Sequence, residues 1–387
     1  MAESIHANPI QTRKTAPDPQ GFQMNAGLGN SEGRGEKDRI SWVDFLRGIA
    51  IILMIPANLS PYYAEPHAMW YRVMSSLAAP TFISLSAGMV ILNSQKHHFN
   101  YYLTRGAFVV LIGVLLDTLL WRILPFASVD VLYVIGIGIP LMYLVRQQKM
   151  SALVASGGIL ILAGPFLQTL LGYHPDVLEI ELGNIYLPDL SRVAASWLVD
   201  GYFPLFPWLG YTFVGAALFR YVFQEKKQID TVRLSILGLI LLVIGALLLF
   251  VPTSAIPNLT NGGILVTREG YSEIFYPPTY GFVFFSNGAI LIQVVLFVRV
   301  RRNFLSAIPM FFGEYCMLVY ISHQVLGEYG LKPLLAWAGV EQVFSDYLFV
   351  VINLVMFIVV AALCKLADLA KRAHPPRNVF LQIIVGK

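Results

Sequence analysis

The chain alternates between long apolar runs and short polar segments along nearly its whole length. A helix that crosses a membrane needs about 20 predominantly apolar residues, and ten runs approach that length. They are roughly 41–59, 70–93, 102–122, 129–146, 151–172, 203–224, 232–252, 279–299, 304–326 and 343–366. The pattern predicts an all-α fold, a polytopic membrane helical bundle of about 10 transmembrane helices. Residues 331–340 form a short re-entrant piece at most, because Lys332 and Pro333 argue against a further span.

The polar segments outside these runs divide the chain into three parts. Residues 1–38 are rich in Gly, Pro, Asn and charge and show no apolar period, so we expect a disordered cytoplasmic tail there. Residues 39–370 form the predicted transmembrane domain, and 371–387 a cytoplasmic C-terminal tail. Two outer connections, 173–202 and 253–278, are long. Each either caps a site or forms a solvated outer surface.

Composition supports a membrane location. Hydrophobic residues make up 56% of the chain and charged residues only 13%, whereas a soluble domain carries about 25% charged residues. Cys316 and Cys364 both lie within apolar runs, so we expect small buried side chains rather than a disulfide framework or a zinc site. No secretory signal peptide is evident. We expect a multi-pass integral protein of the plasma or inner membrane, in contact with the lipid bilayer.

Positive residues recur in every second connection, and this alternation predicts the orientation. Lys and Arg precede the first run, follow the tenth, and occupy the connections after the second, fourth, sixth and eighth runs. By contrast, segment 60–69 has none, and 173–202 has the single arginine Arg192. Both termini are therefore expected in the cytoplasm. Because the basic residues line the predicted inner membrane face, nucleic acid is not indicated as a partner.

Asp44 and Arg47 are ionisable residues within the first apolar run, where charge is costly. They stand at positions i and i+3, on one helical face, and this spacing favours an ion pair. Such a pair either orients the helix at the inner interface or lets Arg47 hold an anionic cytosolic ligand while Asp44 fixes the guanidinium. Gly48, the next residue, allows another helix or a ligand to approach closely.

Two histidines fall near the outer ends of different runs. His67 lies in the loop before the second run, and His323 ends the ninth, about one turn from Tyr320. Histidine there suits general-base, nucleophilic or proton-relay chemistry, although a loop histidine is usually only solvated. Asp117 and Asp130 bracket another outer loop with Arg122 between them, and local ion pairing explains these three residues.

Signatures of soluble enzymes are missing from the sequence, which has no Walker loop, no GxSxG and no HExxH. The seven histidines do not pair at metal-ligand spacing, so no metal is predicted.

Three segments together resemble the heparan-α-glucosaminide N-acetyltransferase catalytic domain family, whose members are multi-span acyltransferases. The first, WVDFLRGIAIILMIPAN at 42–58, is similar to the family's opening Asp-x-x-Arg-Gly span that closes on an asparagine. The second is HAMW at 67–70, and the third is GEYCMLVYISHQV at 313–325, similar to a late Leu-Val-Tyr-x-x-His segment. The segment YFPLFPWLGYTFVGAALFR at 202–220 also looks like bacterial members.

The resemblance implies that an acetyl group moves from cytosolic acetyl-CoA to an amino sugar or glycan on the extracytoplasmic side. It maps the family's catalytic histidine onto His67 and its partner asparagine onto Asn58. His67 would remove the acceptor's proton or carry the acyl group itself, and Asn58 would hydrogen-bond the thioester oxygen. His323 is the third catalytic candidate.

The remaining candidates follow from the chemistry of the two substrates. Coenzyme A carries several phosphate charges, so Arg47, with Asp44 and Arg105, would bind the donor. Trp70, Tyr320 and Asp130 would bind the acceptor.

Other functions stay open from the sequence alone. Intramembrane charges also suit a transporter or flippase of a glycan precursor or a small anion, although no internal repeat is visible. A non-catalytic scaffold in a cell-envelope complex is a further alternative. Within the enzymatic interpretation, transfer to a hydroxyl of a surface polysaccharide competes with transfer to an amine, and the sequence leaves open whether the chain forms a homodimer.

Overall fold

The structure, a computed structural model, describes residues 40–172, 174, 176–224, 229–250, 273–276, 278–374 and 379–385. Within these residues every regular element is a helix, and extended backbone pairs only in isolated bridges such as that between Tyr63 and Val343. The predicted all-α fold is confirmed. The predicted tail 1–38 and most of the loop 253–278 lie outside the described residues.

Fifteen α-helices are present in the described residues. In chain order they are α1 (Ser41–Asn58), α2 (Met69–Ser76), α3 (Ala78–Asn93), α4 (Phe99–Leu115), α5 (Val131–Leu144), α6 (Met150–Leu171), α7 (Leu190–Ala195), α8 (Leu205–Gln224), α9 (Thr231–Phe250), α10 (Tyr280–Phe297), α11 (Phe304–Glu314), α12 (Cys316–Leu326), α13 (Lys332–Trp337), α14 (Asp346–Ala373) and α15 (Val379–Ile384). Shorter helical turns are η1 (Ser60–Tyr62), η2 (Leu116–Trp121), η3 (Ser196–Asp200) and η5 (Gly327–Leu331).

Each of the ten predicted spans has a helical counterpart. In the described residues, eight helical stretches are long and apolar enough to cross a membrane, or nine if the bent pair of α11 and α12 is one span. Helix α5 is apolar but shorter. A polytopic helical membrane bundle is therefore confirmed.

Two predicted spans are each divided into two helices, and one of them is bent. The run 70–93 is divided at Leu77 into α2 and α3. The run 304–326 is broken at Tyr315, where the backbone leaves the helical region and α11 and α12 meet at a bend of 77°. Beyond α12 the chain stays helical through η5 to Trp337, and Lys332 bonds Glu328 at 2.5 Å on the neighbouring turn.

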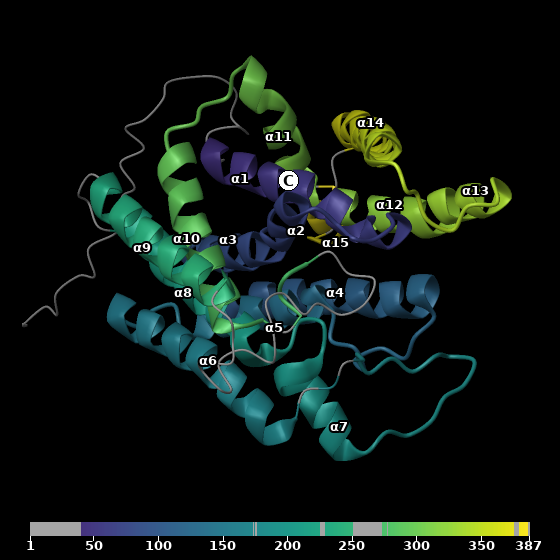
Figure 1. Cartoon of the computed structure of the whole chain (residues 1–387). Helices are drawn as coiled ribbons and strands as arrows, with labels where there is room; N and C mark the ends of the chain where they lie inside the picture. Colours follow the sequence, from purple (N-terminus) through teal and green to yellow (C-terminus); the bar gives the residue numbers. More distant parts are fainter. Residues whose placement is uncertain are drawn as a thin grey trace, which may run out of the picture. The chain divides into compact units, whose positions relative to one another are not determined.

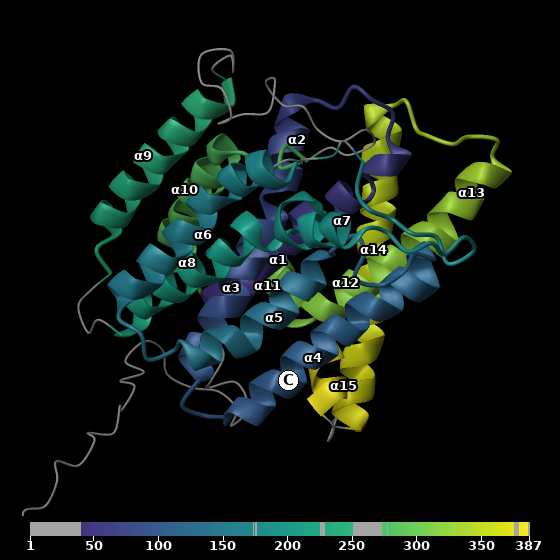
Figure 2. The same ribbon diagram turned by 90° about the horizontal axis from the view of Figure 1, so that it is seen from below.

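Neighbouring helices pack as pairs, α4 with α5, α6 with α8, and α9 with α10. Figures 1 and 2 show α9 beside α10 and α4 beside α5. Buried apolar side chains form one core around α3, α5 and α8 and a second between α1, α12 and α14. The short helix α15 packs against α4, where the rings of Phe380 and Phe108 are 4.7 Å apart.

Helices α1 and α11 touch backbone to backbone at Gly48 and Gly313. A Cβ on Gly48 would lie 1.7 Å from the carbonyl oxygen of Pro309, and one on Gly313 would lie 1.8 Å from that of Asp44. Only glycine permits this approach, because any side chain would overlap the opposite backbone. The contact holds α1, which ends at Asn58, firmly against α11.

Candidate functional site

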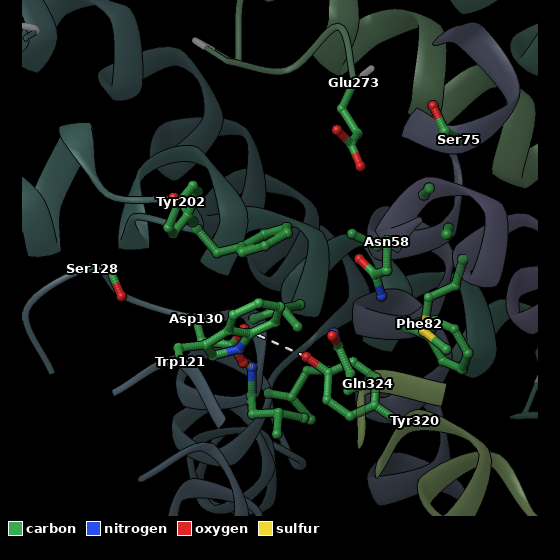
Figure 3. Close-up of a pocket in the computed structure, with 18 of the residues that line it drawn as sticks. Asn58, Ser75, Phe82, Trp121, Ser128, Asp130, Tyr202, Glu273, Tyr320 and Gln324 are labelled. Carbon is green, nitrogen blue, oxygen red and sulfur yellow. Dashed lines mark hydrogen bonds between the residues drawn. The ribbon is translucent and has the colours of Figure 1, made fainter. Parts of the chain in front are cut away.

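A cavity of about 450 Å³ lies where the end of α1 meets the beginnings of α3 and α5, the segment just before α8, and one side of α12. Figure 3 shows Asn58 and Phe82 on one side of it and Tyr202, Ser128 and Asp130 on the other. Four carboxylates line it, Asp117, Asp130, Glu179 and Glu273, whereas none of the described residues in its wall is Lys, Arg or His. The cavity is therefore acidic.

The predicted donor-binding residues lie on α1 and α4, in the halves of these helices that are farther from the cavity. Asn58 ends α1, and Arg47 precedes it by roughly 16 Å along the helix axis, at 1.5 Å per residue. Asp117 lies just beyond α4, whose first half contains Arg105. The cavity thus lies at the helix ends that the alternation of positive charge predicts to be extracytoplasmic.

Asn58 and His323, which the sequence predicts separately as catalytic residues, form a hydrogen bond at the cavity wall. The Nδ2 atom of Asn58 lies 2.9 Å from Nε2 of His323. Asn58 lines the cavity, whereas His323 is only 1% exposed and lies behind it. The bond joins α1 to α12.

The hydrogen bonds of His323 set the direction of the Asn58 amide. Its Nδ1 atom lies 2.7 Å from the carbonyl oxygen of Val319, and because a carbonyl only accepts, Nδ1 carries the proton. In the neutral ring Nε2 then accepts, so Asn58 donates through its amide nitrogen. The amide oxygen of Asn58 is left facing the cavity, as Figure 3 shows.

Two aspartates across the cavity are held by tyrosines. Asp130 caps α5 by accepting from the Leu132 backbone at 2.8 Å, and its other oxygen accepts from the Tyr320 hydroxyl at 3.4 Å, the dashed line in Figure 3. Asp117 accepts a hydrogen bond of 2.5 Å from the Tyr133 hydroxyl. The structure therefore brings together Tyr320 and Asp130, two of the predicted acceptor-binding residues.

Sequence reasoning missed Asp117 as a cavity residue and explained it by pairing with Arg122. In the described structure neither Asp117 nor Asp130 pairs with Arg122, so that explanation is wrong. Each carboxylate instead accepts a hydrogen bond from a tyrosine hydroxyl. The position of Asp117 at the end of an apolar run was the available signal. Gln324 and Glu273 were missed because hydrophobic periodicity does not show which loops and helix ends converge.

The two cysteines differ in their surroundings. Cys364 is fully buried, as expected, whereas Cys316 is half-buried and lines the cavity. Among the residues that the structure describes, no group of three or more His, Cys, Asp or Glu side chains is arranged to hold a metal ion.

His67 and Trp70 are not among the residues that line the cavity. The Nε2 atom of His67 lies 2.9 Å from the carbonyl oxygen of Tyr63, so Nε2 carries the proton and the neutral ring has its lone pair on Nδ1. The imidazole stacks on the Tyr63 ring at 5.1 Å and meets Tyr71 edge-on. Trp70 is 65% exposed. The structure does not bring these two residues together with Asn58 and His323.

Tyr63 anchors the His67 loop to α14. Its ring stacks on Phe349 at 4.4 Å, and its hydroxyl donates to Asp346 at 2.5 Å. The hydrogen bond to Asp346, followed by burial, raises the pKa of Tyr63 to about 12. The phenol therefore stays protonated at neutral pH and keeps this contact.

The predicted ion pair of Asp44 and Arg47 is present, with 3.1 Å between the guanidinium nitrogen and the carboxylate oxygen. Arg105 donates to the hydroxyl of Tyr101 at 3.4 Å. None of these three predicted donor-binding residues lines the cavity. They belong to the first halves of α1 and α4, away from Asn58.

Comparison with known proteins supplies the family. The family described as heparan-alpha-glucosaminide N-acetyltransferase, catalytic, matches residues 39–252, a range that contains Asn58, His67, Asp117 and Asp130. No curated protein matches the chain. The match covers more than half of the sequence and agrees with the helical membrane bundle. The chain therefore belongs to the heparan-alpha-glucosaminide N-acetyltransferase catalytic family of transmembrane acetyltransferases.

Proposed function

We propose that the protein transfers an acetyl group from acetyl-CoA to the amine of an amino sugar or glycan on the extracytoplasmic side of the membrane. The observation that carries the proposal is the Asn58–His323 hydrogen bond at the wall of an acidic cavity. A fixed amide suits charge stabilisation at a thioester, and carboxylates suit an amine. Membership of an acyltransferase family supports the same reaction.

In this proposal Asn58 acts on the thioester carbonyl. Its amide nitrogen has two hydrogens, and His323 uses one of them. The second can donate to the thioester oxygen as negative charge develops there, which is the role of an oxyanion-hole donor. His323 is a positioning residue, because its ring holds the amide without itself lining the cavity.

The two ends of the donor would bind in different places. The absence of Lys, Arg and His from the described cavity wall makes the cavity a poor host for phosphates and a suitable one for the thioester end. We assign the nucleotide end to the cytoplasmic ends of the helices, with Arg47, oriented by Asp44, and Arg105 as phosphate ligands. The pantetheine arm would pass between helices from one end to the other.

The acceptor would occupy the part of the cavity opposite Asn58. Asp130 and Tyr320 offer a carboxylate and a hydroxyl for the sugar or its amine, and their mutual hydrogen bond fixes both. Trp70 would provide an exposed aromatic face for the glycan outside the cavity.

His67 remains a proposed catalytic residue, as general base or acyl carrier. The lone pair on its Nδ1 supports this role, because no described residue hydrogen-bonds that atom. Since His67 does not line the cavity, the role requires the reacting groups to reach it from the side of its loop.

The test is to incubate the purified protein in detergent with acetyl-CoA and a panel of amino sugars, and to follow the release of free thiol. Acceptor-dependent release that falls sharply in Asn58→Ala supports the proposal. The control is Asn93→Ala, at the other end of α3, whose amide bonds only its own helix. Release with hydroxyl acceptors alone would show O-acylation, and substrate flux across proteoliposomes without thiol release would show a transporter.

A further inference from the structure

Asp117 differs from two other buried aspartates in having no cation beside it. Asp44 pairs with Arg47, and Asp200 is held by Arg192 and His174. Asp117 is 3% exposed, and its hydrogen bond from Tyr133 involves only one of its two oxygens. Among the described residues it has no ion-pair partner. A buried carboxylate without a cation is costly to maintain, so this arrangement calls for a function.

The position of Asp117 is fixed by its surroundings. It lies in η2, a wide turn of the π type that extends α4, and such turns are frequent at functional sites. Tyr133, which holds it, is fully buried and stacks on Phe126 at 4.9 Å and on Trp197 at 6.1 Å. Because the tyrosine cannot easily move, the carboxylate is held in one direction at the cavity wall.

A second feature of the cavity points to a ligand with hydrogen-bonding groups. Ser60 lies in its wall and is 1% exposed, yet the Ser60 hydroxyl has no hydrogen-bond partner among the described residues. A buried hydroxyl without a partner is unfavourable unless a ligand or water completes it. Ser60 follows Asn58 closely in the chain, so this unpaired group lies near the proposed reaction centre.

We propose that Asp117 is a catalytic residue that binds the attacking nitrogen of the acceptor and accepts its first proton. The inference rests on the proposed acetyl transfer and adds a base that lies within the cavity. The acceptor's ammonium group supplies the cation that Asp117 lacks. Asp130 and Glu179, also in the wall, add negative charge that attracts the same cation.

The acceptor's R–NH3⁺ gives one proton to the Asp117 carboxylate and becomes R–NH2, whose lone pair attacks the thioester carbonyl carbon. A C–N bond forms and the C–S bond breaks, so the electron pair of the latter leaves on sulfur. His67, the proposed general base, takes the second nitrogen-bound proton and passes it to the thiolate, which departs as coenzyme A thiol, and Asp117 returns its proton to water.

The experiment compares the wild type with Asp117→Asn, a substitution of nearly equal size, across pH 6–9. At neutral pH we expect kcat/KM for an amino sugar to fall about a hundredfold, the typical contribution of a general base. Below the pKa of the amine, the fraction of free amine rises about tenfold per pH unit. The difference in kcat/KM between Asp117→Asn and the wild type should therefore be smaller at pH 9, while the KM for acetyl-CoA stays unchanged. Other ionisable groups around this wall also contribute to the pH dependence of kcat/KM, and they are Tyr133, Asp130, Tyr320, Glu179 and Arg122.

Tyr133→Phe provides a second variant, which keeps the carboxylate but removes its anchor. It should raise the acceptor KM and leave the shape of the pH profile intact. Asp230→Asn, on an exposed ion pair with Arg233 at the start of α9, should match the wild type.

The inference is overturned, while the proposed acetyl transfer stands, if Asp117→Asn shows no loss of kcat/KM or a loss that is the same at every pH. Turnover with hydroxyl acceptors alone also overturns the inference. A wild type that releases no thiol with any acceptor overturns both.

Discussion

Asn58 and His323 are 265 positions apart in the sequence, and their side-chain nitrogens are 2.9 Å apart in the structure. The bond leaves one amide hydrogen and the amide oxygen of Asn58 for the substrates. We expect Asn58→Ala to lower kcat about 10²- to 10³-fold, the range for an oxyanion-hole donor. Steady-state thiol release measures the loss, and the melting temperature in detergent checks that the protein remains folded.

His323→Ala should produce a smaller loss of kcat, because the amide of Asn58 is still present but no longer held. If the two residues act as a unit, the double variant should lose little more than Asn58→Ala alone. Fully additive losses would mean that His323 has a separate role.

For His67 we expect His67→Ala to abolish turnover with little loss of folded protein, because the loop keeps its Tyr63–Asp346 anchor. Size-exclusion chromatography measures folded yield, and intact-protein mass after a rapid acid quench would reveal an acetylated histidine. An unchanged rate in purified His67→Ala would reject the catalytic role.

Arg47→Ala should raise the KM for acetyl-CoA about tenfold, because a charge-assisted hydrogen bond to phosphate is lost. The acceptor KM should not change. Arg233→Ala, at a guanidinium that is 85% exposed, is the control for general loss of positive charge. Reduced stability with an unchanged donor KM would favour the structural interpretation, in which the Asp44–Arg47 pair only orients α1.

Gly48→Ala should destabilise the protein by about 1–3 kcal/mol or more, the range for an overpacked contact, because the added methyl group would overlap the Pro309 backbone. The matched control is Gly158→Ala in α6, where a Cβ meets nothing within 4 Å. Thermal unfolding in one detergent compares the two. Equal melting temperatures would show that the α1–α11 contact is looser than described.

Orientation is tested by cysteine labelling in sealed vesicles. Trp70→Cys should react with an impermeant maleimide from outside, and Lys96→Cys only after permeabilisation. The wild type, with Cys316 and Cys364, gives the background signal. Labelling of position 70 from the cytoplasmic side alone would invert the proposed arrangement of donor and acceptor.

The sequence was sufficient for the helical membrane fold and for the approximate place of each apolar helix, because apolar runs of span length leave few alternatives, but it did not show that two runs are divided or that α5 is short. It also indicated Asn58, His323, Tyr320 and Asp130 individually. It did not predict that they converge, because spacing within one helix says nothing about which distant helix end lies beside it. The break at Tyr315 was missed for a related reason, since the apolar run continues through it without a proline or glycine at that position.

Asp117 shows a different limit of sequence reasoning. A nearby arginine made an ion pair the simplest interpretation, whereas the chain places Tyr133 against the carboxylate instead. The partner of a charged side chain depends on the path of the backbone that follows it. Here Arg122 has a left-handed backbone conformation at the end of η2. Such a turn reverses the local direction of the chain and cannot be read from periodicity.

The bend at Tyr315 has a mechanical consequence. Because their backbones are in contact at Gly48 and Gly313, α1 and α11 cannot slide past one another, whereas α12 leaves α11 at an angle of 77°. Asn58, the proposed oxyanion donor, lies on α1, which is held against α11, whereas His323, which holds its amide, lies on α12 beyond the bend. A change in that angle would move His323 away from Asn58 and break their hydrogen bond while every helix stays intact.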